Sequence, residues 1–296
     1  MTVTTRVAVA TSAMGLDRDS DMPALLAALR ARGVDAVAAA WDDEDFDWSG
    51  CAAVVIRSTW DYPLRRPEFL AWADAVQAVA RLDNPAGVVR WNTDKVYLRD
   101  LTARGVPVVP TRFIAPGEAV VLPGDGQFVV KPSVSAGAYG TARYTEQQRD
   151  LAAGHVASLH GAGATVMVQP YLSRIDEGER ALVFLGGAFS HAVRKDPVLT
   201  EPGVVDDDRV PHPNLRPHRP SAAELALARA ALAAVPERQE LLYARVDIAY
   251  ADDGSPVVME LELVEPNLFM EHGADGPVRL ADLVHERAAA AARAGA

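Results

Sequence analysis

The pattern of apolar residues changes once along the chain, at about residue 107, and this change constrains the fold more than any other feature. Before it, short apolar runs at residues 6–11, 34–40 and 52–56 alternate with amphipathic stretches of helical spacing. Such alternation predicts a parallel α/β layer up to about residue 88. After it, Gly-Gly and Asp-Gly turns separate short apolar segments, a pattern typical of antiparallel hairpins. The sequence therefore predicts an α/β domain followed by α+β structure.

Helix signals accompany both parts of the chain. Asn92 or Thr93 can cap a helix that continues through residue 101 and would carry Lys95 on an exposed face. The alanine-rich tail from Arg279 is typical of a terminal helix. Further helices are expected at residues 20–33, at 67–81 and after Ser221 and Glu224, which have the spacing of a capping box.

Charge and composition exclude several classes of partner. The 296 residues include 40 acidic and 29 basic side chains, which gives a net charge of −11. Without a strongly basic stripe, this balance argues against binding to nucleic acid or to an anionic membrane. No apolar stretch reaches the roughly 20 residues that cross a bilayer, and the N-terminus lacks the pattern of a secretory signal. We therefore expect a cytoplasmic protein whose single cysteine, Cys51, makes no disulfide.

Widespread nucleotide and catalytic motifs are absent from the sequence. It contains no phosphate-binding P-loop, no dinucleotide fingerprint, no H-E-x-x-H or C-x-x-C pair and no G-x-S-x-G elbow. The chemistry that remains depends on lysines, carboxylates and glycines.

A hairpin near the C-terminus gathers carboxylates on one face. If Asp253 and Gly254 form a two-residue turn, Asp247 lies opposite Glu260 and Arg245 lies opposite Glu262. Alternation along the strands then places all four side chains on the same face. One residue more in the turn would move Asp247 to the other face.

This face has more negative charge than Arg245 can balance. A hard divalent ion accepts such oxygen ligands, and Mg²⁺ in particular combines a few carboxylates with the phosphates of a substrate. We therefore predict a Mg²⁺ site at Asp247, Glu260 and Glu262. A solvent-facing strand edge is the alternative.

Lys131 ends an apolar strand and precedes a loop rich in serine, glycine and alanine, which includes Ser135 and Gly137. A lysine on a strand beside a flexible loop with free amides suits phosphate binding. A plain hairpin loop with a lysine at its rim is the alternative. Lys95 alone is a weaker signal.

Two further segments point to a nucleotide. Residues 169–172 (Gln-Pro-Tyr-Leu) follow an apolar strand, and Pro170 must end its ladder, which frees backbone groups for an adenine ring. In the next hairpin, a turn at Gly186 and Gly187 would place Glu179 opposite Arg194. Glu179 could accept from ribose hydroxyls or pair with Arg194, and pairing alone leaves both open.

Another polar group follows the apolar strand at residues 52–56. It consists of Arg57, Ser58, Thr59, Trp60 and Asp61, at the carboxyl end of a parallel strand, where open α/β layers bind ligands. Arg57 could hold a substrate carboxylate through two hydrogen bonds. The alternative is a capped loop with a packed Trp60.

Taken in order, these elements resemble the ATP-grasp superfamily over roughly residues 90–275. The resemblance implies a small α/β domain at residues 1–90 and two lobes, 91–168 and 169–296, that clasp ATP. By the same resemblance, Lys95, Lys131, Ser135 and Gly137 would serve the phosphates, Gln169, Pro170, Tyr171 and Leu172 the adenine, Glu179 the ribose, and Asp247, Glu260 and Glu262 two Mg²⁺ ions.

The sequence departs from that family pattern in one place. Many members have asparagine two residues after the metal-binding glutamate, where this chain has Glu262, and the nearest asparagine is Asn267. Which of the two completes the metal shell stays open, although Glu262 shares the face of Glu260. Asn267 is otherwise expected to bind substrate.

The strings RSTWDY, RWNTDK and ELELVEPNLF are similar to those of the cyclo-ligase family that makes cycloserine from O-ureido-D-serine. This likeness implies transfer of the γ-phosphoryl group of ATP to a carboxylate and ring closure by a nitrogen of the same molecule. Arg194 and Arg245 are the candidates to hold the transferring phosphate. A ligase that joins two molecules, or a regulator that binds nucleotide without catalysis, are the alternatives.

The expected partner is therefore a small amino-acid-like substrate. The sequence determines neither its identity and stereochemistry nor the oligomeric state, and a homodimer is left open.

Overall fold

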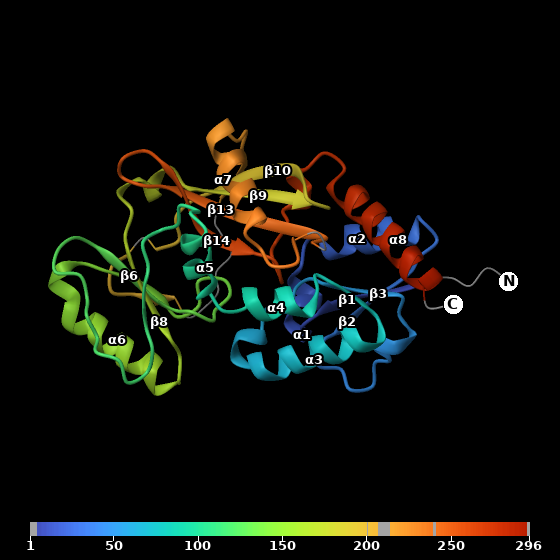
Figure 1. The fold of residues 1–296 in the computed structure, drawn as a ribbon, viewed down its shortest axis with the longest axis horizontal. Helices are drawn as coiled ribbons and strands as arrows, with labels where there is room; N and C mark the ends of the chain where they lie inside the picture. The colour runs from blue at the N-terminus through green and yellow to red at the C-terminus, as the bar shows by residue number, and fades with distance from the viewer. Residues whose placement is uncertain (1–4, 200, 207–213, 239–240, 295–296) are drawn as a thin grey trace.

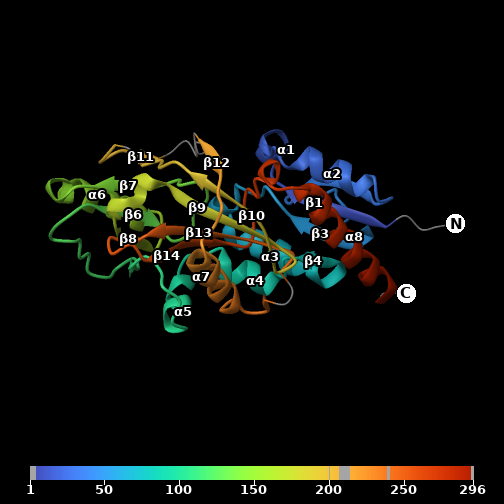
Figure 2. The ribbon, with the colours of Figure 1, turned by 90° about the horizontal axis from the view of Figure 1, so that it is seen from above.

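Three sheets organise the chain, whose computed structural model describes residues 5–199, 201–206, 214–238 and 241–294. Figures 1 and 2 show a central sheet between a first domain and an outer lobe. None of the described helices is both long and apolar enough to cross a membrane.

The first domain contains a parallel four-stranded sheet in the order β2-β1-β3-β4. Its strands are β1 (Arg6–Thr11), β2 (Asp35–Ala40), β3 (Ala53–Ile56) and β4 (Arg81–Asp83), and its helices are α1 (Ala13–Arg18), α2 (Met22–Arg30) and α3 (Arg66–Val79). Val7 and Val9 pack with α2, whereas Ala8 and Ala10 pack with α3. The predicted parallel layer is confirmed.

The last helix returns to this first domain. Helix α8 (Gly276–Ala294) buries Leu280 and Val284 in the same core as Leu25 and Leu29 of α2. Figure 1 shows the two helices side by side. The predicted terminal helix is confirmed and begins three residues earlier than expected.

The central sheet is antiparallel, in the order β12-β10-β9-β13-β14. Its strands are β9 (Glu179–Leu185), β10 (Ala188–Lys195), β12 (Leu215–Pro217), β13 (Tyr243–Tyr250) and β14 (Pro256–Glu262). Helices α4 (Ala86–Asn92), α5 (Tyr97–Ala103) and α7 (Ala222–Ala233) pack on one face of it, against Val246, Ile248 and other apolar residues.

The helix expected through Lys95 is interrupted. Helix α4 ends at Asn92 and α5 begins at Tyr97, so Lys95 lies in the connection between them. Its backbone N–H donates to the Ser133 carbonyl at 2.8 Å, which ties this connection to the outer lobe. The capping box of Ser221 and Glu224 is confirmed at the start of α7.

The outer sheet is also antiparallel, in the order β11-β7-β6-β8-β5. Its strands are β5 (Arg112–Ile114), β6 (Phe128–Pro132), β7 (Thr141–Tyr144), β8 (Val166–Pro170) and β11 (Val205–Asp206). Helix α6 (Arg149–Gly161) covers it and was not predicted, because only Ala152 and Val156 of its residues are buried and its apolar stripe is weak.

Candidate active site

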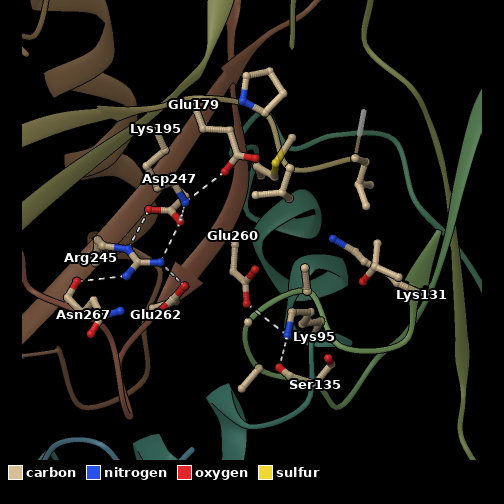
Figure 3. A pocket seen from close by; sticks show the side chains of 18 of the residues that line it. Lys95, Lys131, Ser135, Glu179, Lys195, Arg245, Asp247, Glu260, Glu262 and Asn267 are labelled. Carbon is tan, nitrogen blue, oxygen red and sulfur yellow. Dashed lines mark hydrogen bonds and ion pairs between the residues drawn. The ribbon is translucent and has the colours of Figure 1, made fainter. Parts of the chain in front are cut away.

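A cavity of about 550 Å³ lies where the first domain, the central sheet and the outer sheet meet. The predicted residues that line it are Trp60, Lys95, Lys131, Ser135, Gly137, Gln169, Pro170, Tyr171, Leu172, Glu179, Arg245, Asp247, Glu260, Glu262 and Asn267. Figure 3 shows Lys195 and Arg245 meeting on Asp247, with Lys95 and Lys131 on the other side of Glu260.

The hairpin of β13 and β14 pairs its charged residues as predicted. Asp247 lies opposite Glu260, and Arg245 lies opposite Glu262. The predicted two-residue turn is wrong, because the last pair before the turn joins Tyr250 to Pro256. A bulge that leaves Met259 unpaired restores the register. The longer turn and the bulge shift the register in opposite directions. The predicted pairs of charged residues are therefore confirmed although the predicted turn is wrong.

In the hairpin of β9 and β10 the predicted pairing is wrong by one residue. A register shift between Phe189 and His191 places Lys195, instead of Arg194, opposite Glu179. Arg194 pairs with Arg180, whose guanidinium approaches Glu224 of α7. Because paired residues share a face, Arg194 lies on the α7 side and outside the cavity lining. Lys195 is the functional candidate that the sequence pattern missed.

Lys195 and Arg245 both bind Asp247. The Lys195 Nζ lies 2.6 Å from Asp247 Oδ2 and 3.0 Å from Glu179 Oε2, and Arg245 donates to both oxygens of Asp247 at 2.9 Å. Burial disfavours every charge in this group, but the opposite charges outweigh it. The pKa of Asp247 is therefore lowered, and the pKa values of Lys195 and Arg245 are raised.

Lys95 and Lys131 approach from the other side. Lys95 is buried, donates to the Ser135 carbonyl at 2.6 Å and lies 3.0 Å from Glu260 Oε1. Burial works against its charge, but Glu260 outweighs burial and raises the pKa of Lys95. Among the described residues Lys131 makes no ion pair, and burial lowers its pKa. Lys131 thus presents an ammonium group for which the described residues supply no paired anion.

The loop after Lys131 has the backbone freedom that phosphate binding requires. Gly137 and Ala138 both adopt left-handed backbone angles, with φ of 60° and 61°. This conformation is uncommon for alanine. The Ser135 hydroxyl donates to the Tyr139 carbonyl at 2.6 Å across the loop. The loop is therefore tightly turned, and Ser135 to Ala138 line the cavity.

The predicted adenine segment also lines the cavity. Strand β8 ends at Pro170, and the Tyr171 N–H donates to the Gln127 carbonyl at 2.9 Å. The Gln169 amide donates to the Thr111 hydroxyl at 2.8 Å, so that side chain is held in place. Leu172 and its apolar neighbours give this end of the cavity the character that an aromatic base needs.

Arg57 lies elsewhere than its predicted role requires. It is 1% exposed and donates to the Pro266 carbonyl at 3.0 Å and to Asp21 Oδ2 at 3.3 Å. Asp61 accepts from the Trp41 indole N–H at 2.9 Å. Arg57, Ser58, Thr59 and Asp61 all lie outside the cavity lining, and Trp60 alone of this group reaches it.

Arg57 instead belongs to a clamp on the segment after β14, here called the 266–270 loop. The two oxygens of Asp21 accept from the Leu268 and Met270 N–H groups at 3.1 and 3.0 Å. The same loop supplies the Asn267 carbonyl, which accepts from Arg245 at 2.9 Å, and the Phe269 ring, 5.2 Å from the Arg245 guanidinium. The first domain therefore holds the loop that holds Arg245.

The carboxylates Asp247, Glu260 and Glu262 fit Mg²⁺ by their chemistry. Burial and repulsion from Asp247 and Glu260 raise the pKa of Glu262 to about 7, although Arg245 opposes this. Within the described ranges, no three His, Cys, Asp or Glu side chains form a group that could hold a metal alone. Because Mg²⁺ takes only one or two carboxylates when phosphates complete its shell, the donor set suits an ion bound together with a nucleotide.

The end of the cavity near the first domain was largely missed by the sequence pattern. Its residues come from helix α1, from the turn before α2 and from the segment after β14, which carry no motif, and only their meeting in space identifies them. They are Met14, Arg18, Ser20, Asp21, Glu265, Phe269 and Glu271. Glu265 lies in the segment ELELVEPNLF that supports the family resemblance, but the spacing of residues in this segment does not predict a role for Glu265.

Comparison with known proteins gives consistent matches. Residues 7–84 match the family described as the N-terminal domain of D-cycloserine synthetase DcsG. The cycloserine biosynthesis protein DcsG of Streptomyces lavendulae is 40% identical, with 95% of this chain and 98% of that protein covered. The crystal structure of D-cycloserine synthetase DcsG matches with a TM-score of 0.88 and 38% identity, over 96% of this chain and 99% of that chain.

A more distant neighbour shares the fold. The D-alanine–D-alanine ligase from Bacillus anthracis, in complex with ATP, has a TM-score of 0.70 at 13% identity, over 99% of this chain and 100% of that chain.

Proposed function

The chain belongs to the D-cycloserine synthetase family, and on that premise we propose that it closes the ring of O-ureido-D-serine to give D-cycloserine. Its fold is the ATP-grasp fold, and as a member of this family it is an ATP-dependent ligase that forms a C–N bond. One observation carries the proposal: Lys95, Lys131, Lys195 and Arg245 meet the three carboxylates of β13 and β14 around one cavity.

In this proposal ATP occupies the cavity along the outer sheet. Residues 169–172 face the adenine, and Glu179 accepts from the ribose, since an ion-paired carboxylate keeps lone pairs for further donors. Lys131, which has no ion-pair partner in the described part of the chain, neutralises the phosphates together with Lys95 and Lys195. The loop with Ser135 and Gly137 offers backbone N–H groups to them.

Asp247, Glu260 and Glu262 are the residues that would hold Mg²⁺, with two ions expected. When bound, Mg²⁺ neutralises charge on the phosphates. The side chain of Asn267 lines the cavity beside them and is proposed to contact the substrate.

The proposed reaction begins with a substrate carboxylate oxygen that attacks the γ-phosphorus, and ADP leaves. Arg245 holds the transferring group, and no covalent enzyme intermediate forms. The ureido nitrogen bonded to oxygen then attacks the acyl carbon and loses its proton. A C–N bond forms, and phosphate leaves with the electron pair of the broken C–O bond. One water removes the ureido carbonyl from the ring nitrogen as CO₂ and ammonia.

An ADP-release assay tests this function. The wild type with ATP, Mg²⁺ and O-ureido-D-serine should release ADP without any added amine. Strict dependence on a second amino acid would indicate a ligase that joins two molecules. A protein that binds ATP but releases no ADP with any ureido or amino acid would be a regulator.

Glu260→Gln provides the matching variant. It removes one proposed Mg²⁺ ligand and the partner of Lys95, so kcat should fall about 100- to 1000-fold. Circular dichroism should stay close to wild type, which separates a loss of catalysis from a loss of fold. An unchanged kcat would remove Glu260 from the proposed site.

We further propose a cytoplasmic enzyme with a small-molecule substrate and no nucleic-acid or membrane partner. The buried, free Cys51 supports a reducing location. A homodimer stays open. We also propose domain boundaries at residues 90 and 168. Helix α8 follows the second of these boundaries in sequence but packs on the first domain.

A further inference from the structure

Most charged side chains that line the cavity already have a partner of opposite charge. The ion pairs join Lys95 to Glu260, Lys195 to Glu179 and Asp247, Arg245 to Asp247 and Glu262, and Asp21 to Arg57. Glu271 lies 3.4 Å from the His272 imidazole. In the part of the chain that the structure describes, Lys131, Arg18 and Glu265 line the cavity without an ion pair. Glu265 is the carboxylate among them.

Glu265 is held at the boundary between the central sheet and the first domain. It lies just beyond the end of β14, and its backbone oxygen accepts from the Trp60 indole N–H at 3.1 Å. The Tyr62 hydroxyl is close enough to share a hydrogen bond with its side chain. Both aromatic residues belong to the segment after β3, so the first domain fixes this carboxyl group.

The surroundings of Glu265 call for a cation. Its carboxyl group is close enough to Glu262 and Glu260 to be repelled by them, while Lys95 attracts it. Glu260, Glu262 and Glu265 all line this part of the cavity, and among the described residues Lys95 pairs with Glu260 and Arg245 with Glu262, whereas Glu265 makes no ion pair. A positive group bound beside Glu265 would supply the missing partner.

We propose that Glu265 binds the α-ammonium group of the substrate. This inference rests on the proposed function and assigns a direction to the substrate within the cavity. The carboxyl group that receives phosphate lies toward Arg245, and the ammonium group lies toward the first domain. The chemical class recognised is therefore an α-amino acid with a free, protonated amine.

A metal ion is a weaker match for this place. The Tyr62 hydroxyl can donate a hydrogen bond to the Glu265 carboxyl group. A carboxyl group oriented by such a bond is suited to accept a hydrogen bond from an ammonium group. Glu265 also lies outside the paired rows of β13 and β14 that place Asp247 opposite Glu260.

The test compares two substrates in two proteins. Wild type and Glu265→Gln are assayed with O-ureido-D-serine and with the same molecule lacking its amino group, 3-(ureidooxy)propanoate. Loss of one charge-assisted hydrogen bond should raise the KM of Glu265→Gln for O-ureido-D-serine roughly 10- to 100-fold. The KM for the deamino compound should be the same in both proteins, and the KM for ATP should not change.

Two control variants accompany this comparison. Glu68→Gln removes an exposed carboxylate of the same domain, paired with Arg65 outside the cavity, and should leave both KM values unchanged. Glu265→Asp keeps the charge and should recover part of the affinity for O-ureido-D-serine, which separates a binding role from a folding defect.

The inference would be overturned by equal KM increases for both compounds, by a higher Mg²⁺ requirement with unchanged substrate KM, or by the amine-dependent effect in Glu271→Gln instead. A wild type inactive on O-ureido-D-serine ends the proposed function itself. An active wild type with an unchanged KM in Glu265→Gln ends only the inference.

Discussion

The two ends of the cavity are built in different ways. At the end where we propose that ATP binds, here called the nucleotide end, the charged side chains stand on strands, with Lys131 on β6, Lys195 on β10, Asp247 on β13 and Glu260 on β14. Strand register sets their positions, and ion pairs join several of them. At the other end the side chains come from α1 and the turn before α2 in the first domain, and from the segment after β14.

The polar contacts at that second end are made mainly to backbone atoms. Arg57 donates to the Pro266 carbonyl, and Asp21 accepts from two N–H groups of the 266–270 loop. A substitution at the nucleotide end is therefore expected to remove charge from the phosphate that we propose binds there. A substitution at the other end is instead expected to move the 266–270 loop, which contacts Arg245 and, in our proposal, the substrate.

The largest effect is expected for Lys195→Met at the nucleotide end. The change removes a cation beside Asp247 and Glu179 and leaves most of the side-chain volume. Loss of one charged stabiliser of the transferring phosphoryl group should lower kcat about 100- to 1000-fold. ADP release at saturating ATP and substrate measures it.

Arg194→Met is the matched comparison on the same strand. Arg194 points to the α7 side, so its loss should change kcat less than about twofold. A larger loss of activity in Arg194→Met than in Lys195→Met would show that the register shift between Phe189 and His191 is absent in solution.

A smaller catalytic effect is expected for Arg57→Met at the other end. The change leaves Asp21 and Asp19 buried without their cation, which should cost about 3 kcal/mol in the free energy of unfolding. Because the 266–270 loop then holds Arg245 less firmly, kcat should fall roughly tenfold. Urea unfolding and steady-state kinetics measure the two quantities.

The same variant separates the two roles considered for Arg57. If Arg57 reached the substrate carboxylate, the main effect would be a rise in substrate KM with little loss of stability. Should the variant not fold, Arg57→Lys keeps the charge, loses the paired hydrogen bonds and should give a milder form of the same result.

The sequence predicts those parts of the site that depend on local pattern. The parallel layer, the antiparallel hairpins and the facing pairs of Asp247 with Glu260 and Arg245 with Glu262 follow from periodicity of two residues along strands. Lys131 was found because it ends an apolar strand and precedes a small-residue loop. These features need no knowledge of distant contacts.

The features that the sequence does not predict depend on an irregular backbone or on contacts between segments that are distant in sequence. A single extra residue in β10 moved the functional position from Arg194 to Lys195, and no residue type there signals a bulge. The Arg57 guanidinium could bind a substrate carboxylate, but it already donates to Asp21 and to the Pro266 carbonyl. Both partners are distant from Arg57 in the sequence, so the local pattern does not predict these contacts. Lys95 gained its burial and its partner Glu260 only through tertiary packing.

The smallest effect is expected for Ser221→Ala, which lies at neither end of the cavity. Its hydroxyl accepts from the Glu224 N–H at 3.2 Å at the start of α7. Loss of this cap should lower the free energy of unfolding by about 1 kcal/mol. Helix α7 packs against Val246 and Ile248, on the face opposite Asp247, so kcat and both KM values should not change. If Ser221→Ala nevertheless reduced kcat in proportion to its stability loss, the tenfold effect expected for Arg57→Met would reflect general destabilisation instead of the position of Arg245.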